Sequence, residues 1–313
     1  MLLAFLFSSP QFTSAQDIAA DSANIIQSNP VLPMDTFRIK KRFWRASGEL
    51  LLTELVPWAY NYYVRDADFA HITWESIKYN LQFSNWEWDD NSFSTNQFAH
   101  PYHGNLYFNS FRTNGYNFWQ SAPASVVGSY LWEVAGETHP PAPNDFVNTI
   151  LGGISLGEMT FRLSNMIVNN RQTGFTRQMQ EVFCFLVNPL NGFNRILDKR
   201  WGRVHYDAAD TVKSSLKGVV DIGVRRFSQK KEDVVKRGGN EFYVRLRLQY
   251  GNPSEASKTP FSSFYVAVEA GASDSAYLNQ VVVNGTLRQW KFQETQSHQH
   301  LGSVTMDYDY FLN

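Results

Sequence analysis

The chain contains a single cysteine, Cys184, and its acidic and basic residues almost balance. One cysteine excludes an internal disulfide and a cysteine-cluster metal site. With 28 Lys and Arg against 29 Asp and Glu, the net charge does not favour nucleic acid as a partner. No apolar run approaches the roughly 20 residues of a transmembrane helix. Glycine-rich phosphate loops and dinucleotide fingerprints are also missing, so the sequence predicts no nucleotide and no other cofactor.

Aromatic side chains, in contrast, make up 15% of the 313 residues. Such enrichment accompanies large packed interfaces or girdles at a membrane–water boundary. Residues 1–15, MLLAFLFSSPQFTSA, combine a short apolar core with a small-residue end, which is typical of a secretory signal peptide. Residues 16–45 form a leader with a basic run, which we interpret either as a solvated arm or as a contact with anionic headgroups. The sequence therefore predicts an exported protein.

Residues 46–205 show helical periodicity interrupted by breakers, which predicts a helical domain. Ser47 is suited to cap the first helix, and Pro57 is expected to kink or stop it. Gly152-Gly153 predicts a break between two later helices. Trp86 and Trp88 lie in a polar loop, where tryptophans either pack back onto the domain or line a groove.

From Ser214 the hydrophobic period changes to two. In SLKGVVDIGVRRF, EFYVRLRLQYG and PFSSFYVAVEAG apolar and polar residues alternate, and two later stretches continue the pattern. We expect antiparallel strands in residues 206–313, with a bulge at Gly285. Strands of about ten residues with aromatic ends are typical of outer-membrane β-barrels, although a half-buried soluble sheet gives the same alternation.

Only five such strands are visible, whereas the smallest outer-membrane barrels have about eight. The expected fold class is therefore α+β, with an N-terminal helical segment followed by antiparallel strands of an incomplete barrel. The remaining strands are expected beyond Asn313.

The richest stretch in chemistry-bearing residues runs from His100 to Arg162. Pairs such as Glu133 and Glu137 are four residues apart and would share one face of a helix. A stripe of small residues would let another helix approach closely; it consists of Ser121, Ser125, Gly128, Ser129 and Gly136. The catalytic candidates are His100, His103, Ser121, Glu133 and Glu137. The binding candidates are Arg112, Trp132, Asp145, Glu158 and Arg162.

Four motifs taken together resemble a known family: HPYHGNLYFNSFRTNGYNFWQS, GSYLWEVAGE, PNDFVNTILGGISLGEMTFRLS and NPLNGFNR. They are similar to domain of unknown function 3943, a family of exported proteins of Gram-negative bacteria. The resemblance covers about residues 70–205 and continues weakly through the strands. It implies an outer-membrane-associated protein with helices before β-strands. It implies no established activity, so it assigns no catalytic residue.

Three functional hypotheses follow. In the first, the polar candidates are a satisfied network in a helical plug or periplasmic domain, touching polar sheet residues such as Arg245, Arg247 and Glu269. In the second, the His, Ser and Glu residues form a membrane lipid-modifying hydrolase or a metal-dependent enzyme, although their spacing matches no specific metal signature. In the third, the helices gate a channel or dock a partner.

The sequence favours a structural, binding or transport role at the outer membrane and leaves open whether the protein is an enzyme. The expected partners are outer-membrane lipid and a periplasmic or membrane protein.

Overall fold

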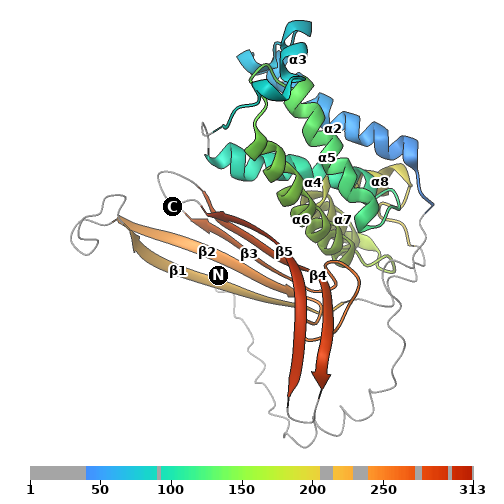
Figure 1. Cartoon of the computed structure of the whole chain (residues 1–313). Coiled ribbons are helices and arrows are strands. Elements are labelled where there is room, and N and C mark those ends of the chain that lie inside the picture. Colours follow the sequence, from blue (N-terminus) through green and yellow to red (C-terminus); the bar gives the residue numbers. More distant parts are fainter. Residues whose placement is uncertain are drawn as a thin grey trace, which may run out of the picture. The chain divides into compact units, whose positions relative to one another are not determined.

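The computed structural model describes residues 40–89, 93–204, 214–227, 239–271, 277–294 and 298–311. The predicted signal peptide and most of the predicted leader lie outside the described residues. In the described part, helices precede a five-stranded antiparallel sheet, as the sequence predicts (Figure 1). The helices are α2 (Phe43–Tyr63), α3 (Trp74–Asn80), α4 (His100–Arg112), α5 (Phe118–Ala135), α6 (Pro143–Ile167), α7 (Gly174–Val187) and α8 (Pro189–Leu197). The strands are β1 (Leu216–Phe227), β2 (Gly239–Tyr250), β3 (Phe264–Gly271), β4 (Leu278–Glu294) and β5 (Gln299–Phe311). None of the described helices is both long and apolar enough to cross a bilayer.

Helix α2 begins four residues before the expected cap and does not end at Pro57. The end of the predicted leader is therefore helical. Two cations of its basic run are engaged inside the fold, because Arg42 and Arg45 each donate to Asp198 at 2.6 Å. These two arginines attach the start of α2 to the end of α8 and do not form part of a solvated arm.

Helix α6 runs without interruption through Gly152-Gly153, where the sequence predicted a break. These glycines instead allow α6 to pass close to α4. A Cβ added at Gly153 would lie 2.5 Å from the carbonyl carbon of Gly104, and one added at Gly104 would overlap with the carbonyl oxygen of Thr149. Only glycine fits where two helix backbones approach this closely.

The small-residue stripe of α5 faces its helical neighbours, as predicted. Gly128 lies under the ring of Tyr107, so a Cβ there would fall within 2.4 to 2.6 Å of ring atoms. Ser125 Oγ donates to the carbonyl oxygen of Gly104 at 3.3 Å, and Ser129 Oγ donates to that of Phe146 at 3.3 Å. The stripe therefore sets the packing of α5 on α4 and α6.

The strands pair in sequence order, so the sheet is a meander with β1 and β5 as its edge strands among the described residues. Val220 pairs with Leu246 and Ile222 with Val244, which places the apolar residues on one face. The expected bulge does not occur at Gly285, which pairs regularly with Met306. The first irregularity comes just after it, between Thr286 and Arg288.

The main hydrophobic core forms where the helices meet the apolar face of the sheet. From the helices come Phe108, Phe118 and Ile154, and from the strands come Val266 and Val283. The first hypothesis expected the helices to contact the polar face of the sheet, but in the structure they pack on the apolar face. Burying apolar area is favourable, whereas burying the charged face would cost desolvation.

The charges of the polar face pair with each other across the strands. Arg225 donates to Glu269 at 2.7 Å, Arg245 donates to Glu269 at 2.8 Å, and Arg247 donates to Asp221 at 2.8 Å. These three arginines are bonded within the sheet.

We expect Gly104→Ala to destabilise the helical domain by about 1–3 kcal/mol or more, because a methyl group there meets the backbone of α6. Gly48→Ala in α2 is the matched control. A Cβ at Gly48 has nothing within 4 Å, so that substitution should stabilise the protein by roughly 0.5–1 kcal/mol. Chemical unfolding in detergent, followed by circular dichroism, measures both. Equal effects of the two substitutions would contradict the close approach of α4 and α6.

Candidate functional site

The helical interior is polar to an unusual degree. Among the described residues, buried polar and charged side chains outnumber buried hydrophobic ones. Buried polar groups destabilise a fold unless they are paired, so their partners decide what the interior can do. The sequence candidates all lie within or next to α4, α5 and α6. Three groups contain all of them except Ser121.

The first group is a buried ion triad that joins α4, α6 and the loop between β2 and β3. Glu158 accepts from Arg112 Nε at 2.7 Å and from Arg162 Nε at 2.8 Å. Arg162 also donates to the carbonyl oxygen of Pro260 at 2.7 Å, and the Arg112 guanidinium lies 4.1 Å from the ring centroid of Phe161. All three charged side chains are less than a tenth exposed. This arrangement satisfies the carboxylate on both oxygens, which is typical of a structural clamp.

The second group is a hydrogen-bonded chain that starts from a proline. Pro57 has no N–H to give to the carbonyl oxygen of Thr53, one helical turn earlier. His103 Nε2 takes that place and donates to Thr53 at 2.7 Å. Its other ring nitrogen, Nδ1, is therefore an acceptor and lies 3.1 Å from the hydroxyl of Tyr107. The same hydroxyl lies 3.0 Å from Glu54 Oε2.

The single hydroxyl proton of Tyr107 cannot serve both neighbours. Burial raises the pKa of Glu54 to about 8, so this carboxyl is protonated at neutral pH. Burial lowers the pKa of His103 to about 4, so the imidazole is neutral. Both short contacts are satisfied when protonated Glu54 donates a hydrogen bond to the Tyr107 oxygen and the Tyr107 hydroxyl donates one to His103 Nδ1. The rings of His103 and Trp132 meet edge to face at 4.8 Å, which places Trp132 as a wall of this chain.

The third group consists of carboxyl groups around the start of α6. Glu133 Oε2 accepts from the backbone N–H of Ala142 at 2.9 Å, while its buried Oε1 has no hydrogen-bond partner among the described residues. Burial, with Asp145 and Asp89 nearby, raises the pKa of Glu133 to about 8. Burial and Asp89 raise the pKa of Asp145 to about 7. Burial and the neighbouring Glu133 hold the pKa of Glu137 well above its usual range.

His100 lies near the same acids, and burial lowers its pKa to about 4 although Asp89 acts in the opposite direction. At neutral pH Glu133 and Glu137 are therefore mainly protonated, Asp145 is close to its midpoint, and the imidazole of His100 is neutral. Carboxyl groups with pKa values of about 7 to 8 can exchange protons near physiological pH.

The hydroxyl groups of the stripe do not join the histidines. Ser121 Oγ donates to the carbonyl oxygen of Asn117 at 2.9 Å, within its own helix. A nucleophile and its base need to lie within about 2.6–3.2 Å. Among the described residues, no bond links Ser121 to His100 or His103, and no three His, Cys, Asp or Glu side chains are grouped to hold a metal ion. The catalytic roles of these residues stay predictions.

The sequence reasoning missed an asparagine network that runs between α4, α6 and α8. Asn188 Nδ2 donates to Asn109 Oδ1 at 2.8 Å, and Asn109 Nδ2 donates to Asn105 Oδ1 at 2.8 Å. Asn191 and Asn194, farther along α8, bond to Ser164 and Glu49 in the same way. The signal was available, because Asn188, Asn191 and Asn194 recur every three residues and so share a face of the helix.

A second buried ion triad was missed as well. Glu181 accepts from Arg195 Nε at 2.6 Å and pairs with Arg177 at 2.8 Å, joining α7 to α8. Glu181 and Arg177 are fully buried. The (i, i+4) spacing of these two residues is the only signal in the sequence, and it is also common on solvated helix faces.

The comparison with protein families finds a match over the middle of the chain. Residues 85–190 match the family model described as Domain of unknown function (DUF3943). Over this segment the chain is similar to the DUF3943 family. All ten candidate residues lie in the DUF3943 segment, whereas Glu49, Glu54 and the asparagines of α8 lie outside it. No curated protein and no solved structure matches the chain.

Glu158→Gln should lower the free energy of unfolding by about 3–5 kcal/mol, because it leaves two buried guanidinium groups without a counter-charge. Asp66→Asn is the control, since Asp66 pairs with His71 at an exposed site with 88% of the aspartate side chain accessible. That change should leave stability nearly unaltered. Urea unfolding in detergent measures both variants. A small, equal effect would show that the triad does not hold the helices.

The acidic group makes stability depend on pH. A carboxyl whose pKa is raised in the folded state favours folding while it is protonated. Its contribution is complete below about pH 4.5 and is lost as pH rises through about 8. We expect the free energy of unfolding to fall between pH 5 and 8, by up to about 1.4 kcal/mol per pH unit for each such group. Glu133→Gln should flatten this slope, and an unchanged slope in the variant would contradict the assignment.

Proposed function

We propose that this protein is associated with the outer membrane and that its role there is structural, binding or transport. The observation that carries the proposal is an inverted distribution of polarity. Charged and polar side chains fill the helical interior, while large apolar side chains lie on the outside. Soluble monomers rarely expose a contiguous apolar surface of this kind, and such surfaces mark protein or membrane contacts.

Helix α2 illustrates the exposed apolar surface. Leu52, Val56 and Tyr60 are each half exposed or more and are four residues apart, so they form one continuous strip. Helix α7 presents Phe183 and Leu186 in the same manner. A strip of this kind suits contact with acyl chains or with the apolar surface of a membrane protein.

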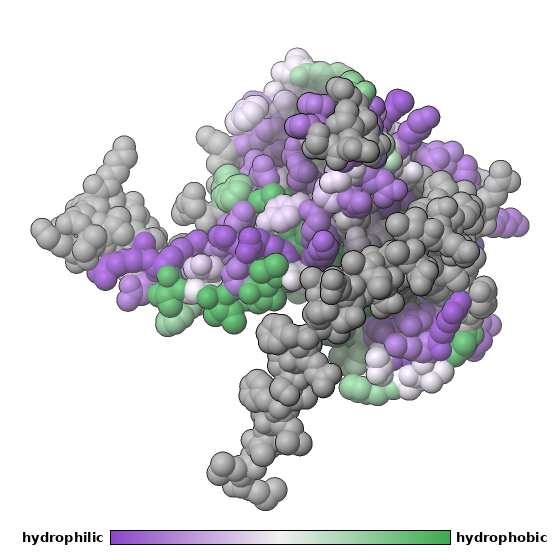
Figure 2. All heavy atoms as spheres, turned by 90° about the horizontal axis from the view of Figure 1, so that it is seen from below, coloured by the Kyte–Doolittle hydropathy of each residue, from purple (hydrophilic) through white to green (hydrophobic). Residues whose placement is uncertain are grey.

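The sheet continues the apolar surface beyond the helices. On β1 and β2 no element among the described residues covers the apolar face, and Ile222 is 80% exposed. Figure 2 shows hydrophobic residues gathered along this part of the sheet, beside a hydrophilic band. The exposed apolar residues there are Val220, Ile222, Val224, Phe242, Val244 and Leu246.

In this proposal the strands belong to an outer-membrane barrel. The polar face, with Glu269 between Arg225 and Arg245, is directed to its interior. The apolar face is directed to lipid at β1 and β2 and to the helices at β3 to β5. Outer-membrane lipid is then the primary partner, and a periplasmic or membrane protein is a second partner suited to the apolar strips of the helices. The hydrolase alternative gains no support, since Ser121 bonds only within its helix.

The proposal predicts different effects for substitutions on the two faces of β1. Ile222→Arg places a cation on the apolar face and should weaken membrane association by about 2–4 kcal/mol. Val219→Arg is the control, because Val219 is 50% exposed but pairs with Arg247 on the polar face. Flotation of the full chain with vesicles of phosphatidylethanolamine and phosphatidylglycerol measures both. Equal flotation of the two variants, or no flotation of the unaltered chain, would overturn the proposal.

A further inference from the structure

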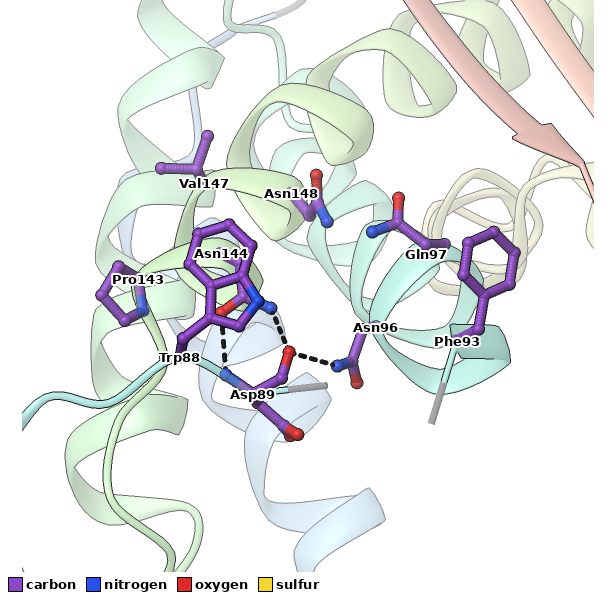
Figure 3. A pocket seen from close by; sticks show the side chains of 9 residues that line it. All are labelled: Trp88, Asp89, Phe93, Asn96, Gln97, Pro143, Asn144, Val147 and Asn148. Carbon is purple, nitrogen blue, oxygen red and sulfur yellow. Dashed lines mark hydrogen bonds between the residues drawn. The ribbon is translucent and has the colours of Figure 1, made fainter. Parts of the chain in front are cut away.

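A pocket of about 580 Å³ lies where the loop before α4 meets the beginning of α6 (Figure 3). It opens to the surface, and its lining residue Phe93 stacks on Tyr310 of the main core, with 5.8 Å between the ring centroids. It is lined by Trp88, Asp89, Phe93, Asn96, Gln97, Pro143, Asn144, Val147 and Asn148. Aromatic rings and side-chain amides dominate this lining, and neither Lys nor Arg contributes to it.

The two tryptophans of the loop have different surroundings. Trp86 packs back onto the domain, with its ring edge-on to Phe146 at 5.6 Å and its Nε1 donating to the carbonyl oxygen of Asn80 at 3.1 Å. Trp88 makes no such contact with the core and is 76% exposed, although its ring faces the pocket (Figure 3). Leaving a large aromatic face in solvent has a cost that packing would avoid, so Trp88 is available to a ligand.

The backbone that carries Trp88 is held firmly against α6. The backbone N–H of Asp89 donates to Asn144 Oδ1 at 3.1 Å, and Asn144 Nδ2 donates back to the Asp89 carbonyl oxygen at 2.7 Å. Asn96 Nδ2 donates to the same oxygen at 3.2 Å. The wall of the pocket is therefore formed before any ligand arrives, which lowers the entropy cost of binding.

Two further amides are not used by the fold. The side chains of Gln97 and Asn148 make no hydrogen bond to any residue that the structure describes. In Figure 3 these amides lie next to each other, with the ring of Trp88 on one side and that of Phe93 on the other. Each amide offers both a donor and an acceptor, the combination that a hydroxyl group requires.

We propose that this pocket binds a neutral saccharide. The face of Trp88 matches the apolar C–H face of a sugar ring, and Gln97 and Asn148 match its hydroxyl groups. An anionic ligand is disfavoured, because the lining contains the carboxylate residue Asp89 and neither Lys nor Arg. The volume lies in the range of small-molecule sites, roughly 300–1,000 Å³, and accommodates a short oligosaccharide. This inference does not depend on the outer-membrane role proposed above.

The test uses the full chain in detergent and four soluble probes: chitotetraose, maltotetraose, cellotetraose and, as a comparison, tetra-alanine. Saturation-transfer NMR identifies the probe that binds, and calorimetry gives its Kd. We expect at least one saccharide to bind, and Trp88→Ala to raise its Kd about tenfold or more. Asn148→Ala should raise the Kd by a smaller factor, because one amide is lost and the aromatic face stays.

Trp74→Ala is the matched control, since Trp74 is 73% exposed on α3 and does not line the pocket. It should leave the Kd unchanged. Unfolding curves of the Trp88 variant should match those of the unaltered chain, because the ring is largely in solvent. Binding of no saccharide, equal losses in the two tryptophan variants, or binding of tetra-alanine in place of the sugars would each overturn the proposal.

Discussion

The contact on which the helical domain depends is the close passage of α4 over α6 at Gly104 and Gly153. Because no side chain separates the two backbones there, the residues one and two turns away come within hydrogen-bonding reach. Arg112 thus meets Glu158, and Asn109 reaches the carbonyl oxygen of Gly157 at 3.1 Å. A wider spacing would leave these groups buried without partners, which costs more than the lost bonds alone. The polar network therefore depends on the glycines that let α4 and α6 approach each other.

That network explains how the helical domain remains folded although many of its buried side chains are polar or charged. Each buried charge of the two arginine triads has partners, and burial raises the pKa of Glu133, which has no cation bonded to it among the described residues. Specific partners give an interior a unique geometry, whereas apolar contacts alone are less selective. The apolar residues that a soluble domain would bury are then free to lie on the surface, where they suit a nonpolar environment.

The strands could be predicted from the sequence because a sheet with one apolar face requires apolar and polar residues to alternate. A shift of the pairing by one residue would move every side chain to the opposite face. The prediction failed at Gly152-Gly153, since glycine marks helix breaks and close helix contacts alike. The candidate residues were placed on the right helices, but their grouping could not be foreseen. Ser121 and His103 lie near each other in the sequence, but they bond to different elements. Ser121 donates to the carbonyl oxygen of Asn117, one turn earlier, whereas His103 donates to that of Thr53, which only the packing of α4 on α2 brings near.

The carbonyl oxygen of Thr53 shows how far such local chemistry extends. Helix α2 continues through Pro57, and the carbonyl oxygen left without a donor there accepts from His103 of α4. The bond that completes α2 therefore also fixes the tautomer of this imidazole. A residue with its own N–H in place of Pro57 would return that bond to α2 and release His103 Nε2. The imidazole would then be free to turn, and Tyr107 and Glu54 would lose the fixed direction of their proton chain. In this fold the missing N–H of Pro57 therefore sets the direction of the hydrogen bonds that link His103, Tyr107 and Glu54.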